Sequence, residues 1–458
     1  MSFQDENNSL IESFLQRTFY KGFKDPQNEK YVNFRSMEII LNYKCNLGCK
    51  YCYVNRFGDE IYPPEAQEDK GVLENLKILL EWIKENKFDP RIEVFSGEVF
   101  VQDMGFKALH MILDMLQGNK GPIIIPTNFT FLLNDTLTKQ VEELMVKSRK
   151  QEMPIVLSAS FDGKHCEANR PFKGMIESHS ATPGGIWTWE YNGKQDPRDD
   201  EYYDRCFAFA KKWRCGFHPM VYSDSIEHWK DNFLWFQRKY EQFDMEWHNL
   251  YLLEVRNVEW SIEQIRDYCE FLEFLIKWAY EKCNEDFDMF RNFLFKGKGF
   301  NILHSALSTT GRGMGCSIQS TMTIRAGDLA IIPCHRTGYP HLLYGKFCVE
   351  NDKIVGIKAH NPELWIAITS LTTRKLPYCE TCVISSLCPS GCLGSQLEVT
   401  GDLFTPIPTV CRLYHAKMKT LIDVFKELNI YDKILSLANP LKRKALIELE
   451  TIMQEVKS

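Results

Sequence analysis

The sequence has no long run of apolar residues and no long run of basic ones. No apolar stretch in its 458 residues approaches the ~20 that a helix needs to cross a bilayer. Residues 1–8 are polar and acidic, whereas a signal peptide begins with basic residues followed by an apolar core. The net charge is −6, which argues against a nucleic-acid partner held mainly through phosphates. We therefore expect a cytoplasmic protein whose partners include neither a membrane nor a nucleic acid.

The composition nevertheless permits a large folded core. Hydrophobic residues make up 44% of the chain and charged residues 25%, which is ordinary for a globular protein. The length is enough for two or three domains of roughly 150 residues each. There are 16 cysteines. In a long intracellular chain, cysteines more often bind metals than form disulfides.

Three of the cysteines stand close together near residue 50. Cys45, Cys49 and Cys52 have the spacing C-x3-C-x2-C. Thiolates are the usual ligands of iron–sulfur clusters, and three of them leave one iron of a cubane open for another ligand. A structural zinc site and simple buried thiols are the alternatives, but zinc sites favour paired C-x2-C spacings and four ligands. The spacing thus favours a [4Fe–4S] cluster with one open iron.

This spacing, with an aromatic residue (Tyr51) before the third cysteine, resembles the signature of the radical S-adenosylmethionine (SAM) superfamily. The resemblance implies that the open iron binds SAM through its amino and carboxylate groups. It also implies that an electron from the cluster cleaves SAM to methionine and a 5′-deoxyadenosyl radical, which abstracts hydrogen from the substrate. An external electron donor of the flavodoxin or ferredoxin type is implied as the source of that electron.

From residue 36 the sequence alternates between strand-like and helix-like segments. Short apolar runs predict strands at 36–42, 91–95, 122–126, 154–160, 216–221 and 249–256. Helical periodicity predicts helices at 69–86, 104–116, 134–147, 201–213, 226–240 and 261–283. Repeated strand–helix pairs imply an α/β fold with a parallel sheet and helices outside it. The count matches the partial (β/α)6 TIM-like barrel of the radical SAM fold, in which ligands bind at the carboxyl ends of the strands.

A small-residue turn with a carboxylate follows the second predicted strand. Ser96, Gly97 and Glu98 resemble the Gly-Gly-Glu motif of the family, with serine in the first position. The resemblance implies that Glu98 accepts hydrogen bonds from the amino group of SAM, as a charge-assisted pair. The alternative is a turn glycine beside a surface glutamate.

Thr127 and Asn128 end the third predicted strand, where the family often has Thr-Asn-Gly. Here Phe129 takes the place of the glycine. A polar contact with cofactor or substrate and a simple helix-entry turn are both open interpretations.

The fourth predicted strand ends in a stretch that resembles Ser-x-Asp-Gly of relatives with a SPASM extension, an iron–sulfur region at the C-terminal end. The resemblance implies that Ser160 and Asp162 bond the ribose hydroxyls of SAM. Arg170 follows in an Asn-Arg pair and would bind the SAM carboxylate. Asp162 with the next glycine is also a good turn dipeptide, so a structural role is an equal alternative.

A second group of cysteines follows residue 300. The spacing C-x2-C-x5-C-x3-C is formed by Cys379, Cys382, Cys388 and Cys392. Upstream of these lie Cys316 and Cys334, and downstream lies Cys411. One zinc ion takes only four ligands, so seven cysteines indicate two further clusters. The pattern resembles the SPASM domain with its two auxiliary [4Fe–4S] clusters, which makes three clusters in all.

The resemblance also implies how these cysteines divide. The outer cluster would be held by Cys379, Cys382, Cys388 and Cys411. The inner cluster would be held by Cys316, Cys334 and Cys392. A fourth inner ligand in the family often lies about six residues before the first, where this chain has Thr310. The inner cluster would then have an open iron or borrow a ligand such as Cys348 or the substrate. The remaining cysteines are expected to be buried small hydrophobes.

The resemblance spans residues 36–415 and predicts four parts. These are an N-terminal helical extension (1–35), a radical SAM partial barrel (36–300), a SPASM domain with two auxiliary clusters (301–415) and a C-terminal helical segment (416–458). Residues 164–200 interrupt the barrel pattern with Gly, Pro, Ser and Asp, which predicts a long functional loop.

Most SPASM relatives modify a ribosomally made peptide or protein, so the resemblance implies such a substrate. We expect hydrogen abstraction from a peptide residue followed by a cross-link, either a thioether to cysteine or a carbon–carbon bond. The alternatives are formylglycine formation on a sulfatase, a SPASM dehydrogenase or epimerase acting on a small molecule, and an iron–sulfur electron carrier. His335 stands where sulfatase-maturing relatives usually have a carboxylate, which argues against that subgroup, although imidazole can also act as a base.

Overall fold

The computed structural model describes residues 36–173, 195–295, 300, 307, 318, 321–369, 371, 376–388 and 391–455. The chain divides into two compact units. The first unit comprises Met1–Ser160, Arg170–Cys215 and Ser317–Ser370, and the second comprises Phe161–Asn169, Gly216–Cys316 and Leu371–Ser458. The predicted N-terminal extension (1–35), residues 174–194 of the predicted loop, Thr310 and Cys316 lie outside the described residues.

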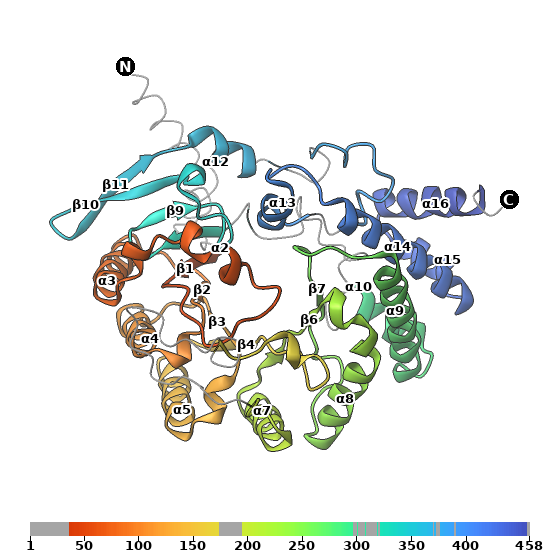
Figure 1. Cartoon of the computed structure of the whole chain (residues 1–458), viewed down its shortest axis with the longest axis horizontal. Coiled ribbons are helices and arrows are strands. Elements are labelled where there is room, and N and C mark those ends of the chain that lie inside the picture. Colours follow the sequence, from red (N-terminus) through yellow and green to blue (C-terminus); the bar gives the residue numbers. More distant parts are fainter. Residues whose placement is uncertain are drawn as a thin grey trace, which may run out of the picture. The chain divides into compact units, whose positions relative to one another are not determined.

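A largely parallel sheet forms the centre of the first unit (Figure 1). Those of its strands that belong to this unit run in the order β11-β10-β9-β8-β1-β2-β3-β4. The strands β1 (Ser36–Ile40), β2 (Ile92–Phe95), β3 (Ile123–Thr127) and β4 (Ile155–Ala159) are parallel neighbours. The first four predicted strands are therefore confirmed, with ends that differ by at most two residues. The chain has the mixed α/β fold that the alternating pattern predicted.

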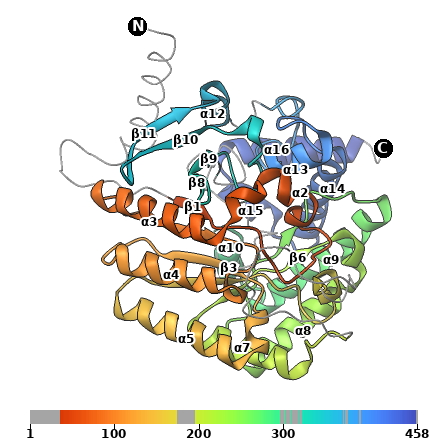
Figure 2. The same ribbon diagram turned by 60° about the vertical axis from the view of Figure 1, so that its left-hand side comes forward.

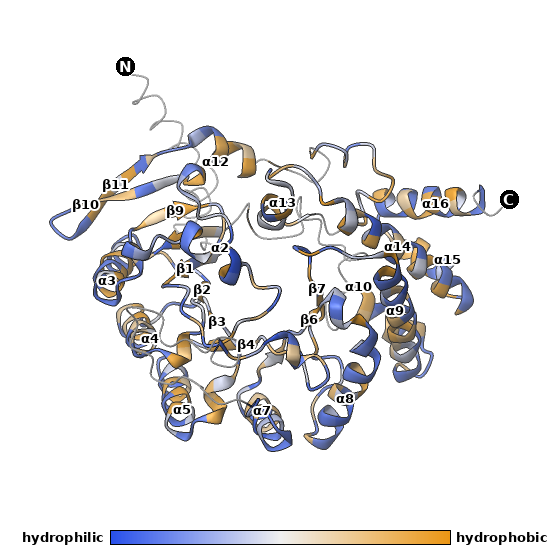
Figure 3. Ribbon diagram, in the orientation of Figure 1, coloured by the Kyte–Doolittle hydropathy of each residue, from blue (hydrophilic) through white to orange (hydrophobic). Residues whose placement is uncertain are grey.

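Helices cover one face of this sheet. They are α3 (Asp69–Glu85), α4 (Asp103–Met115), α5 (Asp135–Lys150) and α7 (Asp200–Trp213), which lie side by side in Figures 1 and 2. Each has an apolar stripe and a polar face, seen as the orange and blue sides of the ribbons in Figure 3. Side chains of a strand alternate between faces. Ile92 and Val94 are buried on one face of β2, whereas Glu93 and Phe95 on the other are only partly buried.

Four strands from the later part of the chain extend the same sheet. β8 (Thr321–Arg325) pairs in parallel with β1, and Ser36 lies opposite Thr321. β9 (Ala330–Ile332), β10 (Gly345–Glu350) and β11 (Lys353–Ala359) follow as antiparallel neighbours, and α12 (Pro362–Thr369) comes after them. Residues 317–370, which the sequence analysis assigns to the SPASM part, therefore belong to the first unit.

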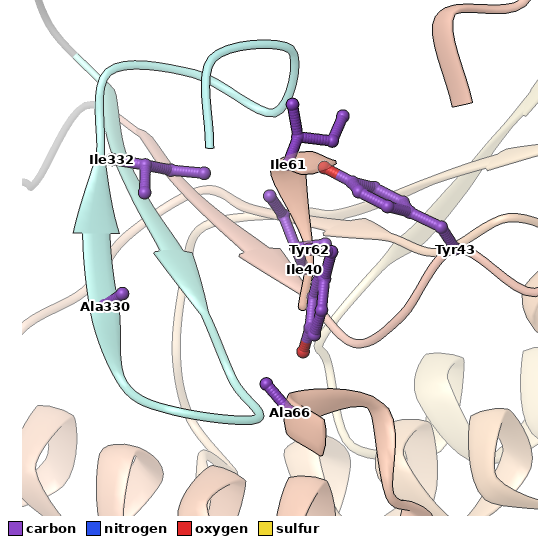
Figure 4. Close-up of a cluster of buried hydrophobic side chains, with 7 residues drawn as sticks. All are labelled: Ile40, Tyr43, Ile61, Tyr62, Ala66, Ala330 and Ile332. Carbon is purple, nitrogen blue, oxygen red and sulfur yellow. The ribbon is translucent and has the colours of Figure 1, made fainter. Parts of the chain in front are cut away.

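A buried cluster packs the end of β1 and residues 61–66 against β9 (Figure 4). Its members are Ile40, Tyr43, Ile61, Tyr62, Ala66, Ala330 and Ile332. The Tyr62 hydroxyl donates to the Leu41 carbonyl at 2.8 Å and accepts from the Gly327 N–H at 3.0 Å. A Cβ on Gly327 would lie 1.6 Å from the Ala66 carbonyl oxygen, so only glycine fits this turn.

The second unit is mainly helical. Its short strands are β5 (Gly216–Phe217), β6 (Met220–Val221) and β7 (Leu253–Glu254), of which β6 and β7 form a separate parallel pair. Its helices are α8 (Trp229–Gln242), α9 (Ile262–Lys282), α10 (Phe287–Phe295), α13 (Leu393–Thr400), α14 (Pro408–Glu427), α15 (Tyr431–Leu437) and α16 (Pro440–Glu455). Ser261 caps α9 with a full capping box.

Three predictions for this unit are wrong in detail. The strand predicted at 249–256 is limited to Leu253–Glu254. The helix predicted at 226–240 begins with a 3-10 segment, Ser223–His228 (η6). The strand predicted at 216–221 is divided into β5 and β6, which belong to different sheets.

In the part of the chain that the structure describes, no helix has both the length and the apolar character needed to cross a bilayer.

Candidate cofactor site

The loop that carries the first three cysteines is held by a segment far away in the sequence. It leaves β1 and ends at α2 (Tyr53–Ile61). The Gly48 N–H donates to the Pro171 carbonyl at 2.8 Å, and the Lys173 N–H donates to the Asn46 carbonyl at 2.9 Å. Sequence reasoning missed this support because residues 171–173 have no pattern that predicts pairing with the loop.

Cys45, Cys49 and Cys52 are all partly buried. Burial raises the pKa of Cys45 to about 11, the charge of Lys173 opposes this rise, and the charges of Glu98 and Cys52 add to it. In the described part of the chain, no three His, Cys, Asp or Glu side chains already stand in a metal-binding arrangement. The loop nevertheless offers three thiols, the donor type that an iron–sulfur cluster uses, with a cationic side chain nearby to favour thiolate.

Glu98, at the end of β2, is buried with 1% of its surface exposed. Its carboxylate accepts from the Thr127 hydroxyl at 2.9 Å and from the backbone N–H groups of Asn128 at 2.5 Å and Phe100 at 3.2 Å. Burial raises the pKa of Glu98 to about 7 in spite of these bonds and the charge of Arg170. A carboxylate that is fixed and desolvated in this way is stabilised by an incoming cation.

Gly97 brings this strand end against the cysteine loop. The Glu98 N–H donates to the Lys44 carbonyl at 2.8 Å. A Cβ on Gly97 would lie 2.1 Å from the same carbonyl oxygen, so no larger residue fits without displacing the loop. The structure therefore brings the predicted Ser96–Glu98 turn and the first cysteine together.

Two residues that sequence reasoning missed complete this junction. The Asn42 side chain donates to Gln102 Oε1 at 2.7 Å and accepts from the Ser96 hydroxyl at 2.8 Å. Gln102 Nε2 donates to the Lys44 carbonyl at 2.8 Å. Both side chains are buried. The one available signal was an asparagine directly after an apolar strand, which is too common to have been decisive.

Asn128 links the end of β3 to the cysteine loop. Its Nδ2 donates to Asn46 Oδ1 at 3.0 Å and lies 3.9 Å from the Cys45 sulfur. Its Oδ1 accepts from the Thr130 N–H at 2.9 Å, which starts the 3-10 segment Thr130–Leu133 (η4). Thus Asn128 forms the helix-entry turn and also contacts the cysteine loop.

Phe129, which stands in place of the family's glycine, has a left-handed backbone with φ of 63°. This conformation favours glycine, so phenylalanine is strained here. The ring is fully buried against Phe131 and Phe209, with centroids 5.6 and 5.7 Å away. Aromatic packing therefore compensates for the missing glycine.

The remaining predicted SAM contacts divide between the two units. Ser160 and Arg170 belong to the first unit, where the buried Arg170 acts on Glu98. Asp162 belongs to the second, where Oδ1 accepts from the Met220 N–H at 2.9 Å and its own N–H donates to Glu167 at 2.9 Å. These bonds give Asp162 a structural role, and its contact with ribose stays a prediction.

Part of the second cysteine group gathers in the second unit. Cys379, Cys382 and Cys411 lie close enough for their charges to act on one another, and burial raises the pKa of Cys379 to about 11. The Cys382 sulfur is 3.4 Å from Nε2 of His415, which follows Cys411 by one helical turn on α14. These three cysteines belong to the predicted outer set.

The predicted inner set is not brought together within one unit. Cys334 belongs to the first unit, where its N–H donates to the Thr337 hydroxyl at 3.0 Å. Cys392 stands at the N-cap position of α13 in the second unit. Cys316 lies outside the described residues. Of the six cysteines outside the predicted ligand sets, four are buried as expected (Cys166, Cys206, Cys215 and Cys283), whereas Cys269 and Cys348 are only partly buried.

Comparison with known proteins identifies the fold. No family model matches the sequence, and no curated protein matches it. The solved structure of anSMEcpe with bound AdoMet (SAM) is similar with a TM-score of 0.53 and 16% identity over 88% of this chain and 98% of that one. The structure of anSMEcpe with AdoMet and the Cp18Cys peptide has a TM-score of 0.52 and 17% identity, over 87% of this chain and 99% of that one. SuiB of Streptococcus suis, bound to its precursor peptide SuiA, has a TM-score of 0.45 and 14% identity, over 88% of this chain and 89% of that one. Since anSMEcpe is a radical SAM/SPASM protein, the chain has the partial TIM-like barrel fold of that group.

Proposed function

We propose that this chain is a radical SAM enzyme that modifies a peptide or protein. The observation that carries the proposal is the junction of Cys45, Glu98 and Asn128, which joins the cysteine loop to the ends of β2 and β3. When bound, a [4Fe–4S] cluster and SAM supply a 5′-deoxyadenosyl radical. The residues present fit these groups, because three thiols share one loop and a buried carboxylate stands beside them.

The residues of this junction have separate roles in the proposed enzyme. Cys45, Cys49 and Cys52 hold the cluster, and the Lys173 charge favours the thiolate form of Cys45. Glu98 accepts hydrogen bonds from the SAM amino group, which favour the ionised form of its desolvated carboxylate. Asn128 fixes the position of Glu98 through its backbone and that of Asn46 through its side chain.

The other predicted contacts with SAM have weaker support. Arg170 is buried near Glu98 and would bind the SAM carboxylate. Thr127, Ser96 and Gly97 shape the turn around Glu98. Ser160 and Asp162 would contact the ribose, on the basis of the sequence alone.

The proposed cofactors also include two auxiliary [4Fe–4S] clusters held by the seven later cysteines. Electrostatic proximity of Cys379, Cys382 and Cys411 supports the outer one. An external donor of the flavodoxin or ferredoxin type would supply electrons. A peptide substrate is supported by the similar fold of anSMEcpe, which was solved with the Cp18Cys peptide.

The favoured reaction is a cross-link in the peptide, a thioether to cysteine or a carbon–carbon bond. A second candidate, formylglycine formation, is favoured by a specific pair of side chains. His335 Nδ1 lies 3.3 Å from Glu38 Oε2, and its ring stacks on Phe95 at 4.3 Å. An imidazole oriented by a carboxylate is suited to accept a proton from a substrate.

Mass spectrometry separates these reactions. The reconstituted protein is incubated with SAM, dithionite and a cysteine-containing peptide, either one encoded beside its gene or a sulfatase-derived one. A cross-link removes two hydrogens and retains the sulfur, whereas formylglycine formation from cysteine removes the sulfur. If only the sulfatase-derived peptide is converted, formylglycine formation replaces cross-linking as the proposed reaction. SAM cleavage without modification of any peptide would contradict the peptide substrate.

A further inference from the structure

A histidine of the second unit contacts one of the predicted cluster ligands. His415 lies on α14 (Figure 1), and its Nε2 is 3.4 Å from the Cys382 sulfur, which is a hydrogen-bond distance. Both residues belong to the second unit, and both are partly buried. A hydrogen bond that is partly shielded from water is stronger than one in full contact with it.

The contact lies beside a second predicted ligand of the outer cluster. Cys411 precedes His415 by four residues on α14, and side chains four residues apart lie on the same face of a helix. The fully buried side chains of Leu413 and Met418 hold this helix in the core. Cys382 and Cys411 therefore approach the same face of α14, although they come from different segments.

The loop that carries Cys382 is fixed by its own contacts. The Cys382 N–H donates to the Cys379 carbonyl at 3.3 Å, and the Cys388 N–H donates to the Ile384 carbonyl at 2.8 Å. The Ile384 side chain is 2% exposed and anchors the loop in the core. Removal of the imidazole is therefore expected to leave the sulfur in place.

We propose that His415 is a positioning residue that acts on the outer auxiliary cluster through Cys382. Its Nε2–H donates to the Cys382 sulfur and raises the reduction potential of the cluster. A thiolate ligand carries no proton, so the imidazole is the donor in this bond. Reduction adds one electron from the external donor and makes the ligand sulfurs more negative, which strengthens the bond in the reduced form. The inference rests on the proposed outer cluster.

The test is a redox titration followed by electron paramagnetic resonance. It uses full-length protein in which Cys45, Cys49 and Cys52 are replaced by Ala, so that the signals come from the auxiliary clusters alone. A further C382A substitution identifies the outer cluster as the signal that is lost. H415L removes the N–H donor and is expected to lower the outer potential by at least a threefold change in the reduction equilibrium, about 28 mV for one electron. The inner potential is expected to stay unchanged.

Two further variants separate the hydrogen bond from the packing of α14. H415Q places a side-chain N–H near the position of Nε2 and is expected to restore most of the outer potential. T420V removes a hydroxyl that donates to the Ala416 carbonyl on the same helix at 3.0 Å, and it is expected to leave both potentials unchanged. H415F replaces H415L if the latter does not fold, as judged by circular dichroism.

Three results would overturn the inference. The first is an outer potential in H415L equal to that of the background protein. The second is an equal shift in T420V. The third is loss of about four of the roughly eight auxiliary irons in H415L, which would make His415 a ligand of the cluster and not a hydrogen-bond donor to it. Absence of any iron signal in the background protein would instead contradict the proposed auxiliary clusters, and the inference with them.

Discussion

Asn128 donates a hydrogen bond from Nδ2 to Oδ1 of Asn46 at 3.0 Å, and both side chains are buried. The bond connects the end of β3 to the loop that carries Cys45 and Cys49. Asn128 Oδ1 is fixed in turn by the Thr130 N–H at 2.9 Å. The geometry of the cysteine loop therefore depends on a strand end that lies 82 residues later in the sequence.

We predict that N128D weakens the cysteine loop. Aspartate retains the acceptor for Thr130 but loses the donor to Asn46 and adds a negative charge near the Cys45 sulfur. Leaving a buried acceptor unsatisfied costs about 1–3 kcal/mol, which urea unfolding of the iron-free protein measures. The matched control is N134D, because Asn134 caps α5 by accepting from the Leu137 N–H and aspartate caps equally well. Equal effects of N128D and N134D would refute the structural role of Asn128.

G97A is expected to separate the Ser96–Glu98 turn from the cysteine loop. The added Cβ would lie 2.1 Å from the Lys44 carbonyl oxygen, and overpacking of this kind costs about 1–3 kcal/mol of stability. We also expect at least tenfold weaker SAM binding, measured by equilibrium dialysis. G71A is the matched control, because nothing lies within 4 Å of its added Cβ and alanine stabilises a helix by about 1 kcal/mol. If G97A proves as harmless as G71A, the close approach is not needed for binding.

The raised pKa of Glu98 predicts that SAM binding releases protons, to an extent that depends on pH. Burial raises the pKa of Glu98 to about 7, so near that pH a large fraction of the carboxyl groups is protonated without ligand. Hydrogen bonds from the SAM amino group favour the ionised carboxylate and lower this pKa, so Glu98 releases a proton on binding. This release is expected to be largest below pH 7, between the lowered pKa and 7, and to vanish well above pH 7, where Glu98 is already ionised. Calorimetry in two buffers of different ionisation enthalpy measures it, with E98Q as the variant that lacks the contribution of Glu98. Equal release from E98Q and wild type would assign the proton to another group.

Iron content tests the number of clusters. Three cubanes predict about twelve irons per chain after anaerobic reconstitution. Replacing Cys45, Cys49 and Cys52 by Ala is expected to leave about eight, measured by a colorimetric iron assay. About four irons in the wild type would refute the two auxiliary sites, and loss of all iron in the variant would show that the clusters are not independent.

Local patterns in the sequence were sufficient for much of the fold. The strands β1 to β4 and the helices after them follow from short apolar runs and helical periodicity, and the caps at Asn134 and Ser261 follow from residue type. Contacts between distant segments could not be predicted in this way. Ser36 pairs with Thr321 across 285 residues, and such pairing depends on the shape of the whole sheet.

At the candidate site, too, local motifs could be predicted from the sequence, whereas contacts between distant segments could not. The three cysteines and Glu98 were predicted because their spacing is characteristic. Gln102 was missed because its role depends on where the Lys44 carbonyl points after folding.

Reductive cleavage of SAM tests the central proposal most directly. The reconstituted protein is incubated anaerobically with SAM and dithionite, and 5′-deoxyadenosine is measured by liquid chromatography. The proposed function predicts 5′-deoxyadenosine from the wild type and none from C45A, C49A or C52A variants that retain their auxiliary iron. Absence of 5′-deoxyadenosine from wild-type protein with its full iron content would contradict the assignment as a radical SAM enzyme.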